Sequence, residues 1–574
     1  MKDRSALFSC ALLLAFFVSQ AFSQNNVAGK ITPGKNKETN ISKTSAPPVT
    51  IEKIESDVAQ ALTVIQDNYV VGKKLDYNEL FKTSIDSMLH TLDPHSNYFD
   101  AKEFEQFRTD QSSQYFGIGA TITDWRDENG KLAGTFIRAT FDNAPANRAG
   151  LRYGDKIVEI NGVSMLGKPF AEVRKSLIGP RGTIAKLIVE RYGTGKREPV
   201  EIVRDAVPQP SIPQSYMIRP GVGFIQMSGG FNQTTYNEFR QDLADLKAQG
   251  MQNLILDLRD NGGGLVNQAY QVANTFLSAG QTIFTQKGRL GGTADPFSAD
   301  NKNPDKTPIV MLVNRNTASA SEILAGALQD HDRALIVGEN SFGKGLVQNP
   351  FLIEYGSMLL LTIAKYETPS GRLIQRDYSN GNLYDYYTKG GSFADDDKPL
   401  KPSGAESKTD TGRIVYSGGG IQPDVLIKPA TITGERGRMR STLNDPIFAF
   451  SLNLAFGKIP GYETYKVNRP IVYNHDLNAA DFPITENVFQ AFKKFAVGNY
   501  KISPALVDRE RVYSEQALRA ELVTAAYGTT TSYQISNETD NQITKSIELL
   551  PRAQKLEMDS VRVNEQKKTT GINR

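Results

Sequence analysis

Leu254-Ile255-Leu256-Asp257-Leu258-Arg259-Asp260-Asn261-Gly262-Gly263-Gly264 is the stretch that decides the fold. A short apolar run leads directly into three glycines, and a segment with helical spacing, 265–277, follows. A strand that passes through a turn into a helix is typical of an α/β layer. The glycines let backbone amides face a ligand, as in an oxyanion hole or a phosphate cradle. A plain tight turn is the alternative interpretation.

The flanking sequence repeats this alternation of strand and helix. Strands are predicted over 222–227, 254–258, 309–313, 335–337 and 358–364, and helices over 234–248, 265–277 and 320–328. This order predicts an α/β core with helices packed on strands. Residues 116–204 differ, because short alternating apolar stretches are separated there by Gly and Asn turns. They predict a compact β-rich module with one or two helices.

Composition excludes several classes of function. The chain has 574 residues, 39% hydrophobic and 22% charged, which suits a globular protein of roughly four domains. Sixty-six basic and 63 acidic residues leave a net charge of +3, too little for a nucleic-acid-binding surface. One cysteine, Cys10, and four histidines exclude an intramolecular disulfide and any Cys-based zinc or iron–sulfur site. We therefore expect no metal and no cofactor, and chemistry that uses Ser, Thr, Lys, Asp, Glu or backbone groups.

The N-terminus has the features of a secretory signal. Lys2 and Arg4 precede an apolar run, and Ala21-Phe22-Ser23 forms a cleavage site of small residues. The apolar run of about 13 residues is shorter than the roughly 20 needed to span a bilayer. We expect a signal peptide over 1–23, a flexible leader over 24–50, and an exported protein of the periplasm or cell envelope that is membrane-peripheral at most. Lipid modification at Cys10 stays open.

Two further constellations carry candidate chemistry. Ser319 lies between an apolar strand and a helix, where the helix dipole and free amides favour an attacking alkoxide and its oxyanion. Ser319 and Glu322 also fit a capping box that only starts the helix. Gly338–Gly345 approaches a phosphate-binding loop but has Gly345 where a magnesium-binding Ser or Thr would follow Lys344.

Lys344 suits a different role. A lysine between glycines can be partly desolvated, which lowers its pKa and allows it to act as a neutral base for a serine. A solvated loop lysine is the alternative. No histidine is well placed as a base, since His331 would lie about 18 Å from Ser319 along a continuous helix. A Ser–Lys pair is the more economical interpretation.

At these residues the chain resembles the carboxyl-terminal processing peptidases, which are serine–lysine endopeptidases with an embedded PDZ domain. The resemblance runs from about Leu92 to Val425. Its motifs are the PDZ-like stretch Asn143–Gly162, the block Ser319–Ile323 with Glu339–Gln348, and the closing motifs Tyr366–Arg372 and Gly420–Val425. Positions 319 and 344 are 25 apart, as in that family, which selects Ser319 over Ser321 as nucleophile.

The resemblance implies a multidomain α/β and β protein: a crotonase-like α/β peptidase core with an inserted PDZ domain and helical N- and C-terminal regions. It implies that Gln348 orients Lys344 and that the amides of Ala320 and Gly263 form the oxyanion hole. Asp330 coincides with a position that the family uses in or near its site, although a helix-end role fits it equally.

The resemblance also makes the PDZ domain a reader of C-terminal tails. Phe116, Gly117, Ile118 and Gly119 resemble its carboxylate-binding loop, with the Ile118 and Gly119 amides as donors and Phe116 and Ile118 beside an apolar pocket. The alternative is a simple bend of the first strand. Expected partners are protein or peptide substrates with accessible, apolar C-termini, and an adaptor or a second copy of the chain is a further possibility.

The domain prediction follows from these motifs. Its parts are an N-terminal helical region over 51–114, the PDZ domain over 115–205, the peptidase core over 206–426 with a polar surface insertion at about 377–412, and a C-terminal helical region over 427–574. The last could serve oligomerisation, an adaptor or bracing of the PDZ domain. Two other functions stay open: a non-catalytic PDZ scaffold or holdase, and a crotonase-type acyl-CoA enzyme, which export and the PDZ module disfavour.

Overall fold

The computed structural model describes residues 50–570 except 72–73, 290–291, 294–295, 380, 382, 389–403 and 468–469. The predicted signal peptide with Cys10, and the leader up to residue 49, lie outside the described residues. The chain forms two compact units. One comprises Met1–Asp100 with Pro350–Leu361, and the other Ala101–Asn349 with Thr362–Arg574.

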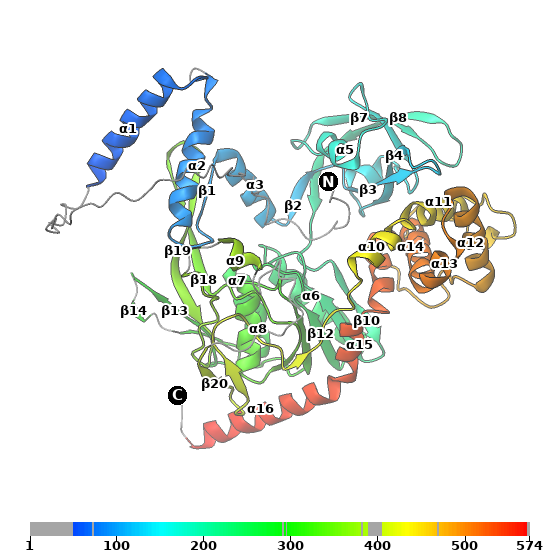
Figure 1. The fold of residues 1–574 in the computed structure, drawn as a ribbon. Helices are drawn as coiled ribbons and strands as arrows, with labels where there is room; N and C mark the ends of the chain where they lie inside the picture. The colour runs from blue at the N-terminus through cyan, green and yellow to red at the C-terminus, as the bar shows by residue number, and fades with distance from the viewer. Residues whose placement is uncertain are drawn as a thin grey trace, which may run out of the picture. The chain divides into compact units, whose positions relative to one another are not determined.

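The first unit is mainly helical (Figure 1). It contains α1 (Ile51–Asn68), α2 (Tyr77–His90) and β1 (Asn97–Phe99), which pairs antiparallel with the start of β19 (Met358–Glu367). Helix α2 begins at Asp76, whose carboxylate accepts hydrogen bonds from two amides of the first turn. The predicted helical region 51–114 also includes α3 (Ala101–Gln111), which is part of the second unit.

A sheet of six strands forms the centre of the second unit. Its order is β10 (Gln214–Arg219), β11 (Val222–Gln226), β12 (Asn253–Asp257), β16 (Ile309–Val313), β17 (Ala334–Gly338) and β22 (Val425–Leu426). The strands run parallel from β11 onward. Every residue of β12, β16 and β17 is buried, which explains their nearly continuous apolar sequence.

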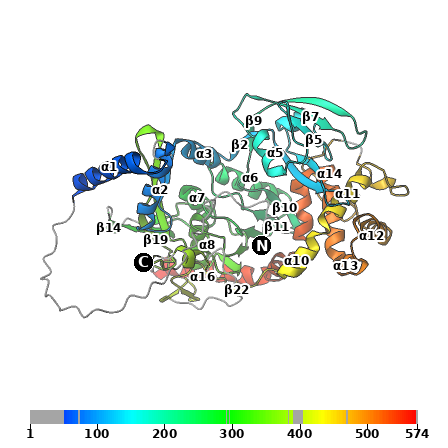
Figure 2. The same ribbon diagram turned by 45° about the horizontal axis from the view of Figure 1, so that its top comes forward.

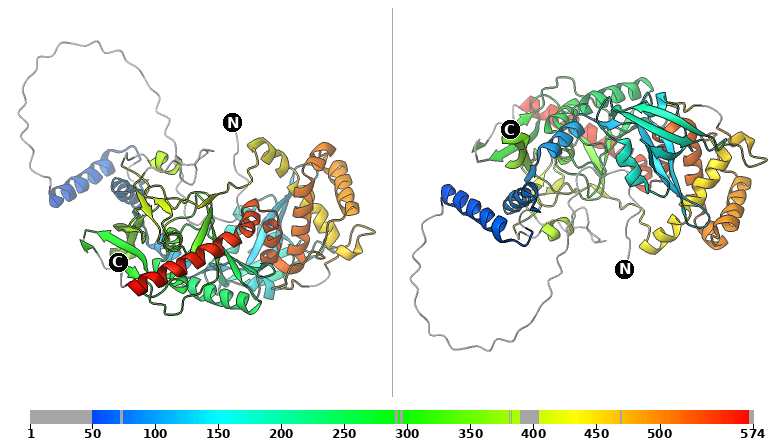
Figure 3. Two further views of the ribbon diagram at one scale, coloured as in Figure 1. Left: turned by 90° about the horizontal axis from the view of Figure 1, so that it is seen from below. Right: turned by 90° about the horizontal axis from the view of Figure 1, so that it is seen from above.

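Helices cover both faces of this sheet. Helices α6 (Thr235–Ala248), α7 (Val266–Phe276) and α8 (Ala320–Asp330) share one apolar core with one face. The opposite face packs against α15 (Asn541–Glu548) and α16 (Leu550–Thr570), as Figure 3 shows for α16. Part of the predicted C-terminal helical region therefore belongs to the layers of this central sheet.

A second group of strands lies beside the central sheet. It comprises β13 (Thr282–Gly288), β14 (Gly292–Thr293), β15 (Phe297–Ser298), β18 (Leu346–Leu352) and the second half of β19. The predicted surface insertion contributes α9 (Leu383–Thr388) and the hairpin of β20 (Glu406–Lys408) and β21 (Ile414–Tyr416). It is not purely a surface feature, because Tyr386 is buried with its ring 5.7 Å from that of Phe342.

The β-rich module is antiparallel throughout. Its sheet has the order β3 (Ala120–Arg126), β4 (Leu132–Thr140), β5 (Lys156–Ile160), β7 (Ile184–Glu190) and β8 (Arg197–Val203), with β6 (Val163–Ser164), α4 (Pro145–Arg148) and α5 (Phe170–Leu177) attached. Strands β2 (Gln114–Gly117) and β9 (Asp205–Pro208) pair where the chain enters and leaves the module. The module thus coincides with the segment predicted as the PDZ domain.

The remaining helices form a cluster that contacts this module (Figure 2). They are α10 (Gly434–Ser441), α11 (Asn444–Ala455), α12 (Glu486–Tyr500), α13 (Pro504–Arg509) and α14 (Arg511–Asn537). Phe448 of α11 lies among the rings of Trp125, Phe136 and Tyr153. An ion pair of 2.5 Å joins Arg138 of β4 to Glu521 of α14. Among the described residues, no helix is long and apolar enough to cross a membrane.

Candidate active site

Ser319 occupies the N-terminus of α8 in a strained backbone conformation. Its φ of 57° and ψ of −119° lie where a residue with a side chain is rarely found. The side chain is partly exposed. Ser321, two residues on, is fully buried and donates its hydroxyl to the Asn261 carbonyl at 3.0 Å. Of these two serines, only Ser319 is placed to meet a substrate.

Glu322 connects two loops: the loop that carries Ser319, called the serine loop, and the loop that carries Lys344, called the lysine loop. Its buried carboxylate accepts hydrogen bonds from the amides of Ser319 at 2.9 Å, Lys344 at 2.8 Å and Gly343 at 2.7 Å, and from the Ser341 hydroxyl at 2.5 Å. Burial raises the pKa of Glu322, while the four hydrogen bonds oppose that rise. The predicted capping box exists, and its Glu322 carboxylate also positions the loop that carries Lys344.

Tyr366 makes a second bridge between the two loops. Its hydroxyl lies 3.0 Å from the carbonyl oxygen of Ser319 and 3.0 Å from that of Lys344. Burial raises the pKa of Tyr366 well above its ordinary value, so the hydroxyl keeps its proton and remains a donor. The backbones at positions 319 and 344 are therefore neighbours, as the predicted Ser–Lys pair requires.

Lys344 and Gln348 are in contact. Lys344 Nζ donates to Gln348 Oε1 at 2.8 Å, and Lys344 itself is partly buried. The next residue, Gly345, is fixed by its amide, which donates to Gln375 Oε1 at 2.8 Å. The structure thus brings Gln348 to the lysine, as predicted from the family motif.

The glycine turn lies directly against Ser319. Gly263 has a φ of 97°, and a β-carbon built there would lie 2.7 Å from the Ala318 oxygen, 2.8 Å from Ser319 Cβ and 2.9 Å from the Ala320 nitrogen. Ala320 is the first residue of α8, where an amide has no partner within the helix. Both predicted oxyanion-hole residues therefore adjoin Ser319.

The Gly263 amide, however, is already bonded. It donates to Asn261 Oδ1 at 2.9 Å, and Asn261 is fully buried. An oxyanion-binding role for this amide requires exchange of that bond for one to the substrate. Sequence patterns gave no sign of this competition, because it depends on the rotamer of one asparagine.

Asp330 and His331 lie at the far end of α8. Asp330 forms a buried ion pair with Arg372 and accepts the Ser370 hydroxyl at 2.6 Å. His331 contacts Asp410 through Nδ1 at 2.7 Å and the Thr282 carbonyl through Nε2 at 2.7 Å. Both residues fasten the helix end to neighbouring segments, which favours the helix-end role for Asp330. In the described part of the chain, no three His, Cys, Asp or Glu residues gather into a metal site.

The predicted peptide-binding loop lies at the start of the PDZ module. Phe116 is partly exposed at the end of β2, and Gly117, Ile118 and Gly119 are buried. The Ile118 side chain belongs to the core of the module, so it does not border an open pocket as expected. Gly119 has a φ of 73°, and a β-carbon there would lie 2.4 Å from Ala144 Cβ, which explains the glycine.

One edge of the sheet in this module is formed by β3. β3 is the terminal strand of the sheet path and pairs with β4 on one side. Asp124 of β3 accepts the first amide of α5, Phe170 N, at 3.1 Å, so strand and helix are linked at one end. This strand-and-helix arrangement fits recognition of an extended chain by strand addition.

Three residues of the site were missing from the predicted set: Glu322 as a link between loops, Tyr366 and Asn261. Glu322 was visible in the capping box and Tyr366 in a closing motif. Asn261 directly precedes the three glycines. The contacts of Glu322 and Tyr366 join segments distant in sequence, whereas the contact of Asn261 with the Gly263 amide is local and depends on a rotamer.

Comparison with known proteins assigns two parts of the chain to known families. Residues 221–385 match peptidase family S41 and residues 142–191 match the PDZ domain, which together define a peptidase with a PDZ module. The chain is 35% identical over 305 residues to the carboxy-terminal-processing protease of Bartonella bacilliformis, covering 52% of this chain and 68% of that protein. It is 32% identical over 377 residues to the carboxy-terminal processing protease CtpA of Bacillus subtilis, covering 66% and 76%.

The chain belongs to the carboxy-terminal processing proteases of peptidase family S41. Among solved structures it is similar to a photosystem II D1 C-terminal processing protease, at 26% identity and a TM-score of 0.34, with 66% of this chain and 94% of that chain covered.

Proposed function

We propose that the protein is an exported serine endopeptidase that binds C-terminal tails through its PDZ domain and cleaves peptide bonds with Ser319 and Lys344. The observation that carries this proposal is the double bridge between the two loops. Glu322 binds the amides of both Ser319 and Lys344, and Tyr366 contacts both carbonyls. Such bridges hold a nucleophile and a base in a fixed relation.

In the proposed reaction, neutral Lys344 accepts the Ser319 proton while the serine oxygen attacks the substrate carbonyl carbon. Gln348 holds the lysine nitrogen in place. Collapse of the tetrahedral intermediate breaks the C–N bond, and protonated Lys344 gives its proton to the leaving amine. Water then attacks the acyl-enzyme in the same way, which releases the new C-terminus and restores Ser319.

Two backbone amides bind the oxyanion in this reaction. The Ala320 amide starts α8, where the helix dipole favours negative charge. The Gly263 amide is the second donor, and it exchanges Asn261 Oδ1 for the oxyanion when the substrate is bound. No metal or other cofactor takes part in this scheme.

Substrate tails bind as a strand along β3, with the terminal carboxylate at the amides of Ile118 and Gly119. Small or apolar terminal residues suit this module. The peptidase part, residues 206–426, has a crotonase-like core, and the PDZ domain occupies 115–205. Export through the signal peptide at 1–23 places the protein in the periplasm or cell envelope.

Variants of the two dyad residues test the proposal. Ser319→Ala and Lys344→Ala should each abolish cleavage of an unfolded protein with an apolar tail and leave thermal unfolding unchanged. Ser321→Ala is the matched serine control and should keep measurable turnover. A serine-reactive probe should label wild type and Ser321→Ala but not Ser319→Ala. Undiminished turnover of either dyad variant would overturn the assignment, and failure of wild type to cleave or label would favour a PDZ scaffold.

A further inference from the structure

The strand that leads into the glycine turn ends in a buried charge pair. Asp257, the last residue of β12, is fully buried. Both of its carboxylate oxygens accept from Arg259: the amide and Nε reach Oδ1 at 2.9 Å, and Nη2 reaches Oδ2 at 2.6 Å. This bidentate contact fixes the direction of the guanidinium group.

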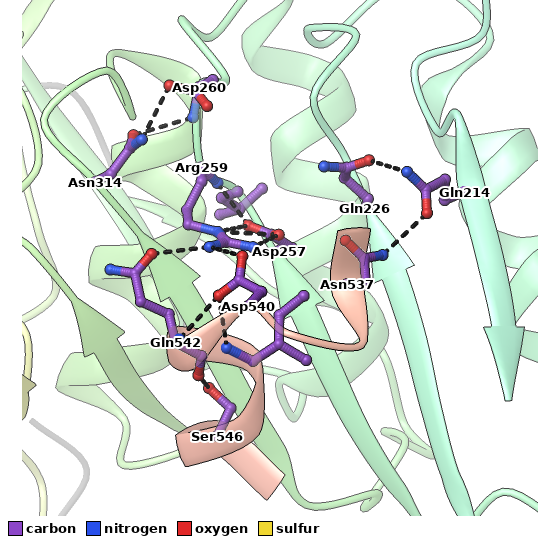
Figure 4. Close-up of polar contacts among 12 residues, drawn as sticks. Gln214, Gln226, Asp257, Arg259, Asp260, Asn314, Asn537, Asp540, Gln542 and Ser546 are labelled. Atoms are coloured by element: carbon purple, nitrogen blue, oxygen red, sulfur yellow. Dashed lines mark hydrogen bonds and ion pairs between the residues drawn. The ribbon is translucent and has the colours of Figure 1, made fainter. Parts of the chain in front are cut away.

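The remaining nitrogen of Arg259 is bound by the C-terminal region. Arg259 Nη1 donates to Asp540 Oδ2 at 2.7 Å and to Gln542 Oε1 at 2.8 Å (Figure 4). Asp540 is also the N-cap of α15, because its other oxygen accepts the amides of Gln542 and Ile543. Although burial opposes the charge, the two carboxylates raise the pKa of Arg259 above its ordinary value. Arg259 therefore keeps its positive charge.

The residues on either side of Arg259 hold the serine loop. Asp260, with a φ of 62°, accepts the side-chain amides of Asn314 at 2.9 Å and Asn316 at 2.7 Å. The Leu258 carbonyl accepts the Thr317 hydroxyl at 2.8 Å. Asn314 through Thr317 directly precede the nucleophile, so the turn and the loop of Ser319 form one hydrogen-bonded assembly.

We propose that the start of α15 positions the oxyanion-binding turn: Asp540 and Gln542 hold Arg259, and Arg259 fixes residues 258–263 against the loop of Ser319. This inference rests on the proposed function, because it assigns Arg259, Asp540 and Gln542 to positioning of the amides that bind the oxyanion. Such donors must be held within about 0.5 Å of their productive places.

Anchoring of α15 alone does not account for these contacts. Ile543 of α15, and Leu550 and Ala553 of the adjoining α16, already pack into the apolar layer on the far face of the sheet. A buried ion pair adds little net stability compared with apolar packing. The charged contacts instead connect the start of α15 with the turn that adjoins both Ser319 and Ala320.

Asp540→Asn separates positioning from capping, because asparagine is an equally good N-cap but lacks the charge. We expect kcat for a short unfolded peptide to fall about tenfold with KM within twofold, since displacements well under 1 Å cost less than the roughly 10² seen for 1 Å. Acylation by a serine-reactive probe should slow equally. Glu538→Gln is the matched control: Glu538 lies two residues earlier and pairs with Arg519 at 3.0 Å within the C-terminal helices. It should keep wild-type rates.

A second variant, Arg259→Lys, tests the inference independently if Asp540→Asn loses its fold. Arg259→Lys keeps a positive charge beside Asp257, but its single side-chain nitrogen cannot reach Asp257, Asp540 and Gln542 together. We therefore expect acylation to slow at least as much as in Asp540→Asn, when both are measured well below the melting temperature. Rates of Asp540→Asn and Arg259→Lys equal to those of Glu538→Gln would overturn the inference while leaving the proposed function intact. Cleavage by Ser319→Ala would instead defeat the proposed function itself.

Discussion

Gly263 is the position where one added carbon tests the oxyanion site most directly. In Gly263→Ala the new methyl group would lie 2.7 to 2.9 Å from the Ala318 oxygen, Ser319 Cβ and the Ala320 nitrogen. None of these atoms can move away by a side-chain rotation. The substitution also places alanine at a φ of 97°, a conformation that disfavours residues with a β-carbon. The turn, the serine loop or both must shift.

The expected loss follows from the donors that such a shift disturbs. Loss of one oxyanion-hole donor costs about 10² to 10³ in kcat, or about 2.7 to 4 kcal/mol. The methyl group sits beside the Ala320 amide and alters the backbone of Gly263, so at least one donor is affected. We expect kcat to fall by at least about 10² with a much smaller change in KM.

The assay is steady-state cleavage of an unfolded peptide together with thermal unfolding. Gly262→Ala is the control, because a β-carbon at Gly262 meets no atom within 4 Å. The control should keep kcat within about threefold of wild type, a loss under 1 kcal/mol. If Gly263→Ala keeps the kcat of Gly262→Ala in a folded protein, neither neighbouring amide is crucial and the oxyanion assignment is refuted.

Three further outcomes are expected. Phe448→Ala should destabilise the chain by about 3 to 5 kcal/mol and expose the PDZ module to limited proteolysis, because its ring fills the interface; Phe450→Ala should destabilise similarly without that exposure. Burial and two neighbouring carboxylates raise the pKa of Asp242 to about 7, so stability falls as pH rises from about 4 to 7. Asp242→Asn should therefore raise stability by about 1 to 2 kcal/mol at pH 8 and leave it unchanged at pH 4, as measured by denaturant unfolding; a gain at pH 4 would contradict the cause given. Tyr366→Phe should cost about 1 to 3 kcal/mol of stability and lower kcat about tenfold, since two buried carbonyls lose their donor; an unchanged kcat would show that this bridge is not needed.

Local sequence patterns predicted the layers well. The apolar run 309–313 is β16 with the same bounds, because a strand buried on both faces needs an unbroken apolar sequence. Helix α7 spans Val266–Phe276, one residue shorter at each end than the predicted helix 265–277. The Ser319 and Lys344 loops follow strand ends of the same sheet, so local order alone brought them to one edge.

Features that depend on packing between distant segments, or on a single rotamer, could not be predicted from the sequence. Ile118 was expected beside an apolar pocket, yet its side chain is part of the apolar core of the module. Tyr386 lies in a polar stretch of sequence, yet its ring is buried against Phe342 of the lysine loop. The bond between Asn261 and the Gly263 amide depends on a single rotamer. None of these three features produces a periodic pattern in the sequence.

The course of α14 links the PDZ module to the catalytic core. Its first half contributes Glu521, which pairs with Arg138 of the PDZ sheet. Gly528 then breaks the helix with a φ of 87° and ψ of 173°, which only glycine adopts readily. After this break, the side-chain amide of Asn537 donates to Gln214 and to Tyr216, both of β10, at 3.0 Å each. Three residues later, Asp540 accepts a hydrogen bond from Arg259. One continuous segment therefore contacts the PDZ module, the edge strand of the core and the turn beside Ser319, so its removal would disturb all three together.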